Sequence, residues 1–162
     1  MSALLLPALA HAQAEYSGAT FKRTNLLVSD LDRSLTVYQD ILGFSLAGRA
    51  KAVDDSYIYE LFQLSEKAVL HFALLSAGSQ QQRTMALVEV TGVDIPRRQA
   101  PYTSAVVLGV TDLEGIVAKL RALGLEVAPA NLGTGNEGSQ FIEQAFVDFD
   151  GNVVLLYEWQ PR

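Results

Sequence analysis

Apolar residues recur along the chain at two spacings, and these predict two copies of the same run of elements. Alternating or continuous apolar runs predict strands over 21–28, 44–51, 68–76 and 85–91, and again over 103–110, 126–128, 140–148 and 152–159. Helical spacing predicts one helix over 31–42 and a second over 113–123. Each half therefore has the order strand, helix, strand, strand, strand.

The ends of the two predicted helices match. Asp30 and Asp112 each precede the first apolar position and can accept bonds from unpaired N–H groups of the first turn. Gly43 and Gly124 follow the last apolar position, where a left-handed backbone is common. The helices open on the similar segments Val28-Ser29-Asp30-Leu31 and Val110-Thr111-Asp112-Leu113. Self-similarity seen twice at a long period indicates a duplicated module rather than a solenoid.

These patterns predict a single domain within 162 residues. We expect module one over 19–92, a proline-containing linker over 93–101 and module two over 102–160. One helix cannot cover both faces of its sheet. We therefore expect an α+β fold in which two βαβββ modules form a curled mixed sheet with outer helices and a concave cavity.

The first fourteen residues are typical of an export signal. A short apolar run is followed by Ala12-Gln13-Ala14, an A-x-A cleavage pattern, although no basic residue precedes the run. The alternative is an N-terminal tail of the mature protein. The sequence favours a signal peptide over 1–14 and a mature domain over 15–162, located in the periplasm or secreted. No segment is long and apolar enough to predict a membrane span.

Charge and cysteine content exclude several classes of function. The formal net charge is −6, which opposes binding to nucleic acid or to anionic lipid. The one short basic pair, Arg97-Arg98, is expected to be a solvated loop. The chain has no cysteine, so disulfides, thiolate nucleophiles and Cys-ligated zinc are excluded.

Two motifs indicate a family. The segment from Val28 through Leu35 and Tyr38 to Phe44 looks like V-x-D-L-x-x-S-x-x-F-Y-x-x-x-L-G-F, and Asp148-Phe149-Asp150-Gly151-Asn152 is similar to D-P-D-G-N. In both motifs and in the duplicated module, the chain resembles the glyoxalase/bleomycin resistance/extradiol dioxygenase (vicinal oxygen chelate) superfamily. The resemblance implies the two-module fold and, since such chains commonly pair, a homodimer.

The resemblance also shows where the family's metal ligands would lie. Metal-binding members carry His five residues before each V-x-D-L valine and Glu three residues after the D-P-D-G-N asparagine. Arg23, Ala105 and Leu155 occupy those positions here, and none is an ordinary ligand for a divalent metal. Since His11 falls within the predicted signal, His71 is the one histidine of the expected mature chain. We therefore expect no metal and no other cofactor.

Strand alternation then gives the candidate site. The predicted ligand-binding residues are Arg23, Asn25, Glu89, Ala105, Leu155 and Tyr157. The candidates for catalysis, if the protein is an enzyme, are Arg23, His71, Glu89 and Tyr157. A buried Arg23 requires an acidic partner, for which Glu89 is a candidate, or an anionic ligand. For Glu89 alone, pairing with a basic group or exposure to water is the structural alternative.

Three functions are compatible with these residues. The first is a protein that binds a small organic molecule, anionic or carbonyl-containing, without metal. The second is a metal-independent lyase or isomerase in which Arg23 stabilises an enolate or carboxylate. The third, which the ligand positions disfavour, is a metal-dependent lactoylglutathione lyase- or dioxygenase-like enzyme.

Overall fold

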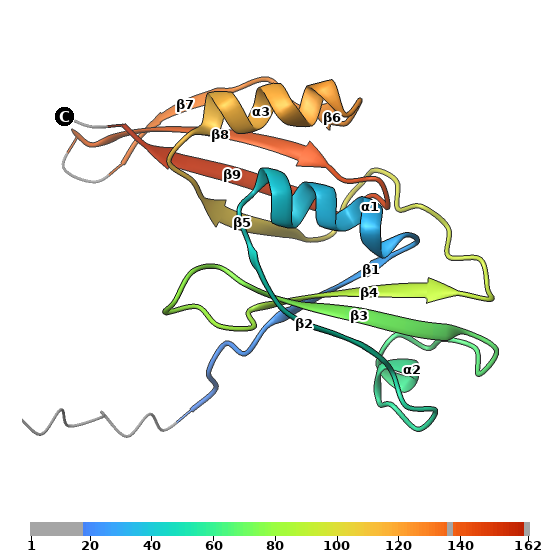
Figure 1. Cartoon of the computed structure of the whole chain (residues 1–162). Coiled ribbons are helices and arrows are strands. Elements are labelled where there is room, and N and C mark those ends of the chain that lie inside the picture. Colours follow the sequence, from blue (N-terminus) through green and yellow to red (C-terminus); the bar gives the residue numbers. More distant parts are fainter. Residues whose placement is uncertain (1–17, 136–137, 161–162) are drawn as a thin grey trace, which may run out of the picture.

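The computed structural model describes residues 18–135 and 138–160, and two modules follow one another in the same order (Figure 1). The predicted signal peptide, with His11, lies outside the described residues. The first module contains β1 (Thr24–Val28), α1 (Leu31–Leu35), the π-helix η1 (Thr36–Ile41), β2 (Ser45–Lys51), α2 (Ile58–Leu61), β3 (Val69–Ser76) and β4 (Met85–Thr91). The second contains β5 (Ala105–Gly109), α3 (Leu113–Ala122), β6 (Glu126–Val127), β7 (Asn131–Thr134), β8 (Gln140–Val147) and β9 (Val153–Trp159).

The two long helical segments begin at the residues that the sequence predicts and end one residue earlier than predicted, at Ile41 and Ala122. Asp30 and Asp112 each accept a hydrogen bond from the backbone N–H three residues later, at 2.9 and 3.0 Å. Gly43 and Gly124 both follow the last turn with φ of +76°. Glycine adopts this left-handed conformation without the steric cost of a Cβ atom. Local sequence therefore sets the length of each helix.

The strands form two sheets with the same topology. The order is β1-β4-β3-β2 in the first sheet and β5-β9-β8-β6 in the second, where β7 also pairs with β8. The outer pairs β1–β4 and β5–β9 are parallel, and the other pairs are antiparallel. The pair β6 and β7 takes the place that β2 has in the first module. The structure thus confirms the α+β fold of two βαβββ modules.

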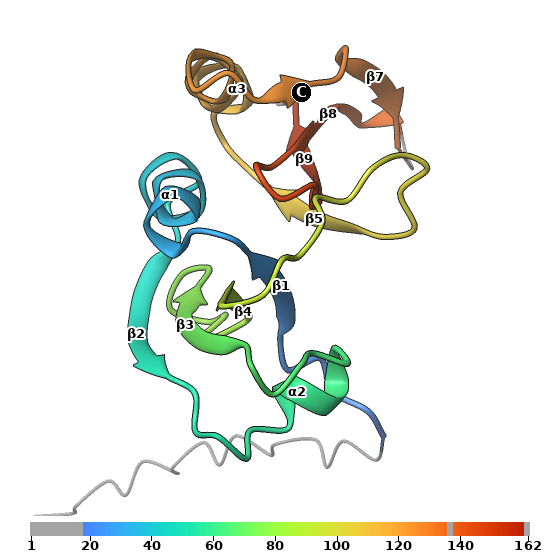
Figure 2. The ribbon, with the colours of Figure 1, turned by 90° about the vertical axis from the view of Figure 1, so that its right-hand side faces the viewer.

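The α1–η1 segment and α3 lie on the same side of the protein, and they share one hydrophobic core with the adjacent sheet faces (Figure 2). The core includes Tyr38 and Leu87 of module one and Leu120, Phe146 and Leu156 of module two. The sheets differ in one respect from the predicted architecture, because they do not join into a single curled sheet. The edge strands β1 and β5 carry no ladder between them, and the shared helical core holds the modules together instead.

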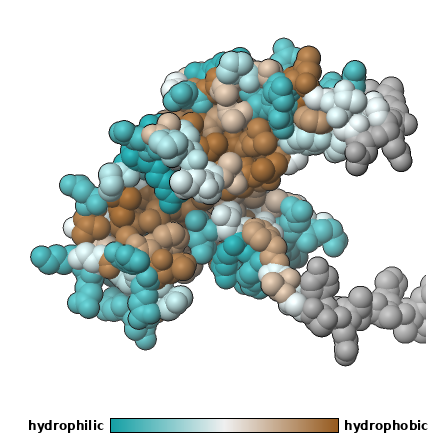
Figure 3. Space-filling model, turned by 180° about the vertical axis from the view of Figure 1, so that it is seen from behind, coloured by the Kyte–Doolittle hydropathy of each residue, from teal (hydrophilic) through white to brown (hydrophobic). Residues whose placement is uncertain are grey.

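The sheet faces that point away from the helices differ between the modules. In module one this face is covered by α2 and its flanking loops, which pack Ile58, Tyr59 and Leu64 against Leu70 and Val90. In module two the equivalent face is open, and Val107 is 61% exposed and Trp159 56% exposed. Figure 3, a view from behind, shows hydrophobic residues on this side in both the upper and the lower half. None of the helices in the described ranges is long and apolar enough to cross a membrane.

Candidate functional site

The turn between β8 and β9 is the most densely bonded polar feature in the described ranges. Asp148, only 2% exposed, accepts hydrogen bonds from the backbone N–H groups of Asp150 and Asn152, at 2.9 and 2.7 Å. The Asn152 side chain donates a further bond to Asp148 at 2.9 Å. The Tyr38 hydroxyl, from module one, donates to the same carboxylate at 2.9 Å. Burial and the Asp148 carboxylate raise the pKa of Tyr38 well above its ordinary value, so its proton stays in place.

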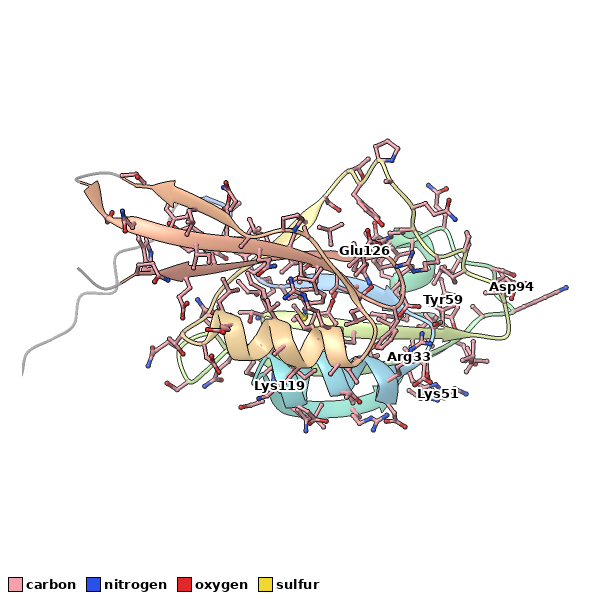
Figure 4. All side chains as sticks on the ribbon, turned by 90° about the horizontal axis from the view of Figure 1, so that it is seen from above. Arg33, Lys51, Tyr59, Asp94, Lys119 and Glu126 are labelled. Atoms are coloured by element: carbon pink, nitrogen blue, oxygen red, sulfur yellow. The ribbon has the colours of Figure 1, made fainter. Side chains whose placement is uncertain are left out.

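The same turn contacts the end of β1 and the start of α1. The Asn152 side-chain amide donates to the Leu27 carbonyl at 3.3 Å, and the Ser29 N–H donates to Asp150 at 3.0 Å. Arg33 lies 3.7 Å from Asp150, and its guanidinium carbon is 4.7 Å from the centre of the Phe149 ring. Figure 4 shows Arg33 at the same end of the molecule as Lys51 and Tyr59. The turn therefore joins the two modules.

The linker arginines lie in an exposed loop, as the sequence predicts, and both also donate hydrogen bonds to this turn. Arg97 donates from Nε to the Phe149 carbonyl at 3.2 Å. Arg98 donates from Nη1 to the Asn152 side-chain oxygen at 2.7 Å, and its backbone N–H donates to the Asp150 carbonyl at 3.1 Å. Both residues are exposed, yet each is held in place. The charge pattern of the sequence could not predict these hydrogen bonds, because their acceptors are carbonyl and amide oxygens that lie far away in the sequence.

A cavity of about 570 Å³ lies between the edge strands β1 and β5. Its walls are formed by Thr24–Leu26 of β1, Phe62, Gly151–Val153, and residues of the linker and the start of module two, namely Arg98, Gln99 and Pro101–Val106. The hydrogen bond to Asn152 orients Arg98 while leaving most of its five N–H donors for other partners. The cavity therefore combines a fixed guanidinium with amide and hydroxyl groups on a partly apolar wall.

Two of the predicted ligand-binding residues, Asn25 and Ala105, line this cavity. Arg23 is half-buried just before β1 and is not among the lining residues. Leu155 and Tyr157 share one face of β9, and the β5–β9 register places Val107 and Gly109 beside them on that face. The structure thus brings together Asn25 and Ala105, and it places Leu155 and Tyr157 farther along the same sheet face.

Glu89 and His71 lie on the helix side of their sheet, which corrects the expected position of Glu89 in the cavity and gives the face of His71, which strand alternation leaves open. Glu89 accepts a hydrogen bond from the Leu31 N–H at 2.9 Å, at the start of α1. His71 is its cross-strand neighbour, with Nδ1 3.4 Å from the Glu89 carboxylate. The physical reason is register, since a shift of one residue turns a side chain to the opposite face. Glu89 therefore pairs with His71 rather than with Arg23.

Among the described residues, no three His, Cys, Asp or Glu side chains are placed to hold an ion. The three positions that the family resemblance assigns to ligands carry a guanidinium, a methyl and an isobutyl group, at Arg23, Ala105 and Leu155. The residues present do not fit a metal bound by imidazole and carboxylate.

Comparison with known proteins agrees with the two-module architecture. A model of the Glyoxalase/Bleomycin resistance protein/Dioxygenase superfamily matches residues 20–156, most of the chain. No curated protein matches the chain.

Several solved structures have a similar fold at low sequence identity. A glyoxalase family protein from Bacillus cereus is 18% identical, with a TM-score of 0.69 over 93% of this chain and 100% of that one. The trypanothione-dependent glyoxalase I of Leishmania major is 23% identical, with a TM-score of 0.56 over 87% of each chain. A fosfomycin resistance protein from Listeria monocytogenes, solved with Mn(II) and sulfate, is 14% identical, with a TM-score of 0.54 over 88% of this chain and 93% of that one. At these identities the likeness concerns the fold alone.

Proposed function

The chain belongs to the Glyoxalase/Bleomycin resistance protein/Dioxygenase superfamily, and we propose that it binds a small organic molecule without a resident metal ion. The ligand is anionic or contains a carbonyl group, and it occupies the cavity between β1 and β5. The observation that carries the proposal is the Arg98 guanidinium, which is fixed by Asn152 at 2.7 Å in the wall of a cavity of about 570 Å³. A cavity of this size suits a metabolite or a drug-sized compound.

The chemistry of the cavity supports an anionic or carbonyl ligand. The planar guanidinium of Arg98 can donate two parallel hydrogen bonds to a carboxylate, and such pairs are the stronger hydrogen bonds in proteins. Asn25 and Tyr102 add an amide and a phenol to the lining. This differs from the expectation for Arg23, because the cation in the cavity wall comes from the linker and not from β1.

Binding is favoured over turnover because the proton-transferring candidates lie elsewhere. His71 and Glu89 are on the helix side of their sheet and do not line the cavity. Desolvation and the nearby Glu143 raise the pKa of Tyr157, so its phenol is deprotonated at neutral pH even more rarely than an ordinary tyrosine. The metal-dependent alternative lacks a fitting set of donors at Arg23, Ala105 and Leu155.

The test compares two neighbouring arginines. Both Arg97 and Arg98 hold the β8–β9 turn, but only Arg98 lines the cavity. Titration calorimetry with phenylpyruvate, which carries a carboxylate and a ketone, is performed with EDTA present. Arg98→Gln should weaken binding by roughly tenfold or more, the equivalent of one charge-assisted hydrogen bond. Arg97→Gln should leave the affinity unchanged.

The proposal is wrong if Arg98→Gln binds the ligand as tightly as the parent protein, or if EDTA abolishes binding. Thermal unfolding of both variants shows whether loss of binding reflects loss of structure. Elemental analysis of protein purified without chelator adds an independent readout, because a stoichiometric metal ion would contradict the proposed binding mode.

We also propose that the protein is exported and that it pairs into a homodimer. Export is supported by the signal pattern over 1–14. N-terminal sequencing of the protein from the periplasm or medium should give a sequence that begins at Glu15.

Homodimer formation is supported by the apolar outer surface of α2, where Tyr57 is 71% and Leu61 is 50% exposed. Light scattering after gel filtration should give twice the mass of one chain. The Leu61→Lys variant should have the mass of a single chain.

A further inference from the structure

Three aromatic side chains gather on the open face of the second sheet, at the end away from the cavity between β1 and β5. The Phe141 and Tyr157 rings stack with their centres 4.8 Å apart. The Trp159 ring stands nearly perpendicular to both, with its centre 5.9 Å from Phe141 and 5.2 Å from Tyr157. Phe141 pairs with Trp159 across β8 and β9, so all three rings come from adjacent strands of one face.

The cluster is supported on one side and open on the other. On the β7 side, a Cβ atom built on Gly133 would lie 2.1 Å from the Phe141 ring, which shows that the ring rests directly on the β7 backbone. On the β5 side, Gly109 is the strand neighbour of Tyr157, and a Cβ atom there would meet nothing within 4 Å. A slot therefore lies beside the Tyr157 ring.

This slot belongs to a hollow of about 450 Å³ formed by the ends of two strands. Its walls are Gly109–Thr111 after β5 and Tyr157–Gln160 at the end of β9. Ala105, in the cavity between β1 and β5, is four residues from Gly109, which corresponds to about 13 Å along the strand. The hollow is thus separate from that cavity and lies at the strand ends, where Tyr157 and Trp159 line it from the open face and Glu158 from the other.

Charge near the rings is negative. Glu143 is the cross-strand neighbour of Tyr157, and desolvation first and Coulomb repulsion from the Glu143 carboxylate second raise the pKa of the phenol. Glu143 itself accepts a hydrogen bond from Asn131 at 2.8 Å. The electron-rich faces of Tyr157 and Trp159 add to this negative potential, which attracts cations and opposes anions. The net charge of −6 acts in the same direction.

We propose that this hollow is a second binding subsite, which takes a planar aromatic or heteroaromatic ring that carries no negative charge. The ring enters the slot that Gly109 leaves open and stacks against Tyr157, with Trp159 forming the perpendicular wall. Stacking on aromatic side chains and exclusion of water supply the affinity. This subsite does not depend on the cavity at Arg98, and either one can exist without the other.

The sequence provides its own reporter, because Trp159 is the only tryptophan in the chain. The probes are three two-ring compounds: N-methylquinolinium, 2-naphthalenemethanol and 2-naphthalenesulfonate. The indole N–H gives one signal in a nitrogen-15 NMR spectrum, and titration calorimetry gives the affinity. We expect the cation and the neutral alcohol to bind and to shift the indole signal. The sulfonate, which has a similar ring system, should bind roughly tenfold more weakly or not at all.

Two glycine substitutions provide a matched pair. Gly109→Val fills the slot and keeps all three rings, and it should reduce the affinity for the cationic probe by roughly tenfold or more. Gly48→Val in β2 is the control, because Gly48 is also a strand glycine with open space at its Cβ position. Neither glycine has a positive φ, so valine fits both backbones. Gly48→Val should bind the probe as the parent protein does.

Any of the following results would overturn the proposal. Equal binding by the Gly109→Val variant, equal binding of the sulfonate, or binding without a shift of the indole signal would place the probe elsewhere on the surface. If no probe binds and Gly109→Val alters the oligomeric mass, the face is covered by a second copy of the chain. Arg98→Gln should leave probe binding unchanged, so a failure of this subsite is distinguishable from a failure of the proposed function.

Discussion

Removing one hydroxyl group from the module junction should destabilise the whole protein. Tyr38 is fully buried, and its hydroxyl donates to Asp148, itself 2% exposed, at 2.9 Å. Tyr38→Phe keeps the ring and its packing in the shared core but removes one donor to a buried carboxylate. Hydrogen bonds to charged groups contribute about 1.5–3 kcal/mol, so we expect a loss of about 2 kcal/mol in the free energy of unfolding. For a domain of this size, that corresponds to a fall of roughly 4–8 °C in Tm.

The assay is urea unfolding at pH 7, followed by tryptophan fluorescence and circular dichroism. Tyr102→Phe is the control, because the Tyr102 side chain is exposed and the same chemical change there should, without ligand, alter stability by less than about 0.5 kcal/mol. A Tyr38→Phe variant as stable as the control would refute the reasoning. It would mean that the bonds from Asn152 and the turn backbone satisfy Asp148 without help from module one.

The pH dependence gives the same junction a second signature. The folded-state pKa of Tyr38 is raised well above 10.0 by burial first and by Asp148 second. Above about pH 10 the unfolded phenol loses its proton while the folded one keeps it, so stability falls as the pH rises. The Tyr38→Phe variant has no phenol at this position, so this loss of stability at high pH does not occur in it. The difference in stability between the two proteins should therefore be constant between pH 7 and 9 and should narrow above pH 10.

Three further substitutions test the local features that build the fold. Gly151→Ala places a Cβ atom 2.3 Å from the Arg98 carbonyl at a φ of +83°. The substitution should lower the free energy of unfolding in urea by roughly 1–3 kcal/mol, while Gly48→Ala, the control, should have little effect. Asp112→Ala removes the N-cap bond to Gly115 and should cost about 1 kcal/mol, which Asp112→Asn should largely restore. Glu89→Ala removes the acceptor for the Leu31 N–H and should cost about 0.5–2 kcal/mol, whereas Glu89→Gln should cost less because it keeps an oxygen there.

The fold could be predicted because its signals are local and occur twice. The caps Asp30 and Asp112, and the helix-ending glycines Gly43 and Gly124, each depend on residues within one turn. Apolar periodicity then gives the order of the elements. The separation of the two sheets was not predictable in this way, since no local pattern specifies whether the edge strands β1 and β5 pair.

The site was harder to predict, because it depends on register and on contacts distant in sequence. The face of Glu89 depends on a single residue of register, and the structure turns it toward the start of α1. Arg98 stood out in the sequence only as half of a basic pair, because its side-chain partner, Asn152, lies 54 residues away. Asn25 and Ala105 both line the cavity, as strand alternation predicts for the face they share with the family's ligand positions, and their role in ligand binding stays a prediction.

The position of Arg98 couples ligand binding to the junction between the modules. Its guanidinium is held by Asn152, and Asn152 also bonds to Asp148 and to the Leu27 carbonyl of module one. A ligand that binds Arg98 therefore favours the state in which this turn is intact, and it should stabilise the folded protein by mass action. The converse also holds by linkage: a substitution that loosens the turn without touching the cavity, such as Tyr38→Phe, should weaken the ligand to the extent that it releases the turn in the folded protein. A variant that lowers Tm but leaves ligand affinity unchanged would show that the cavity keeps its shape when the junction is weakened.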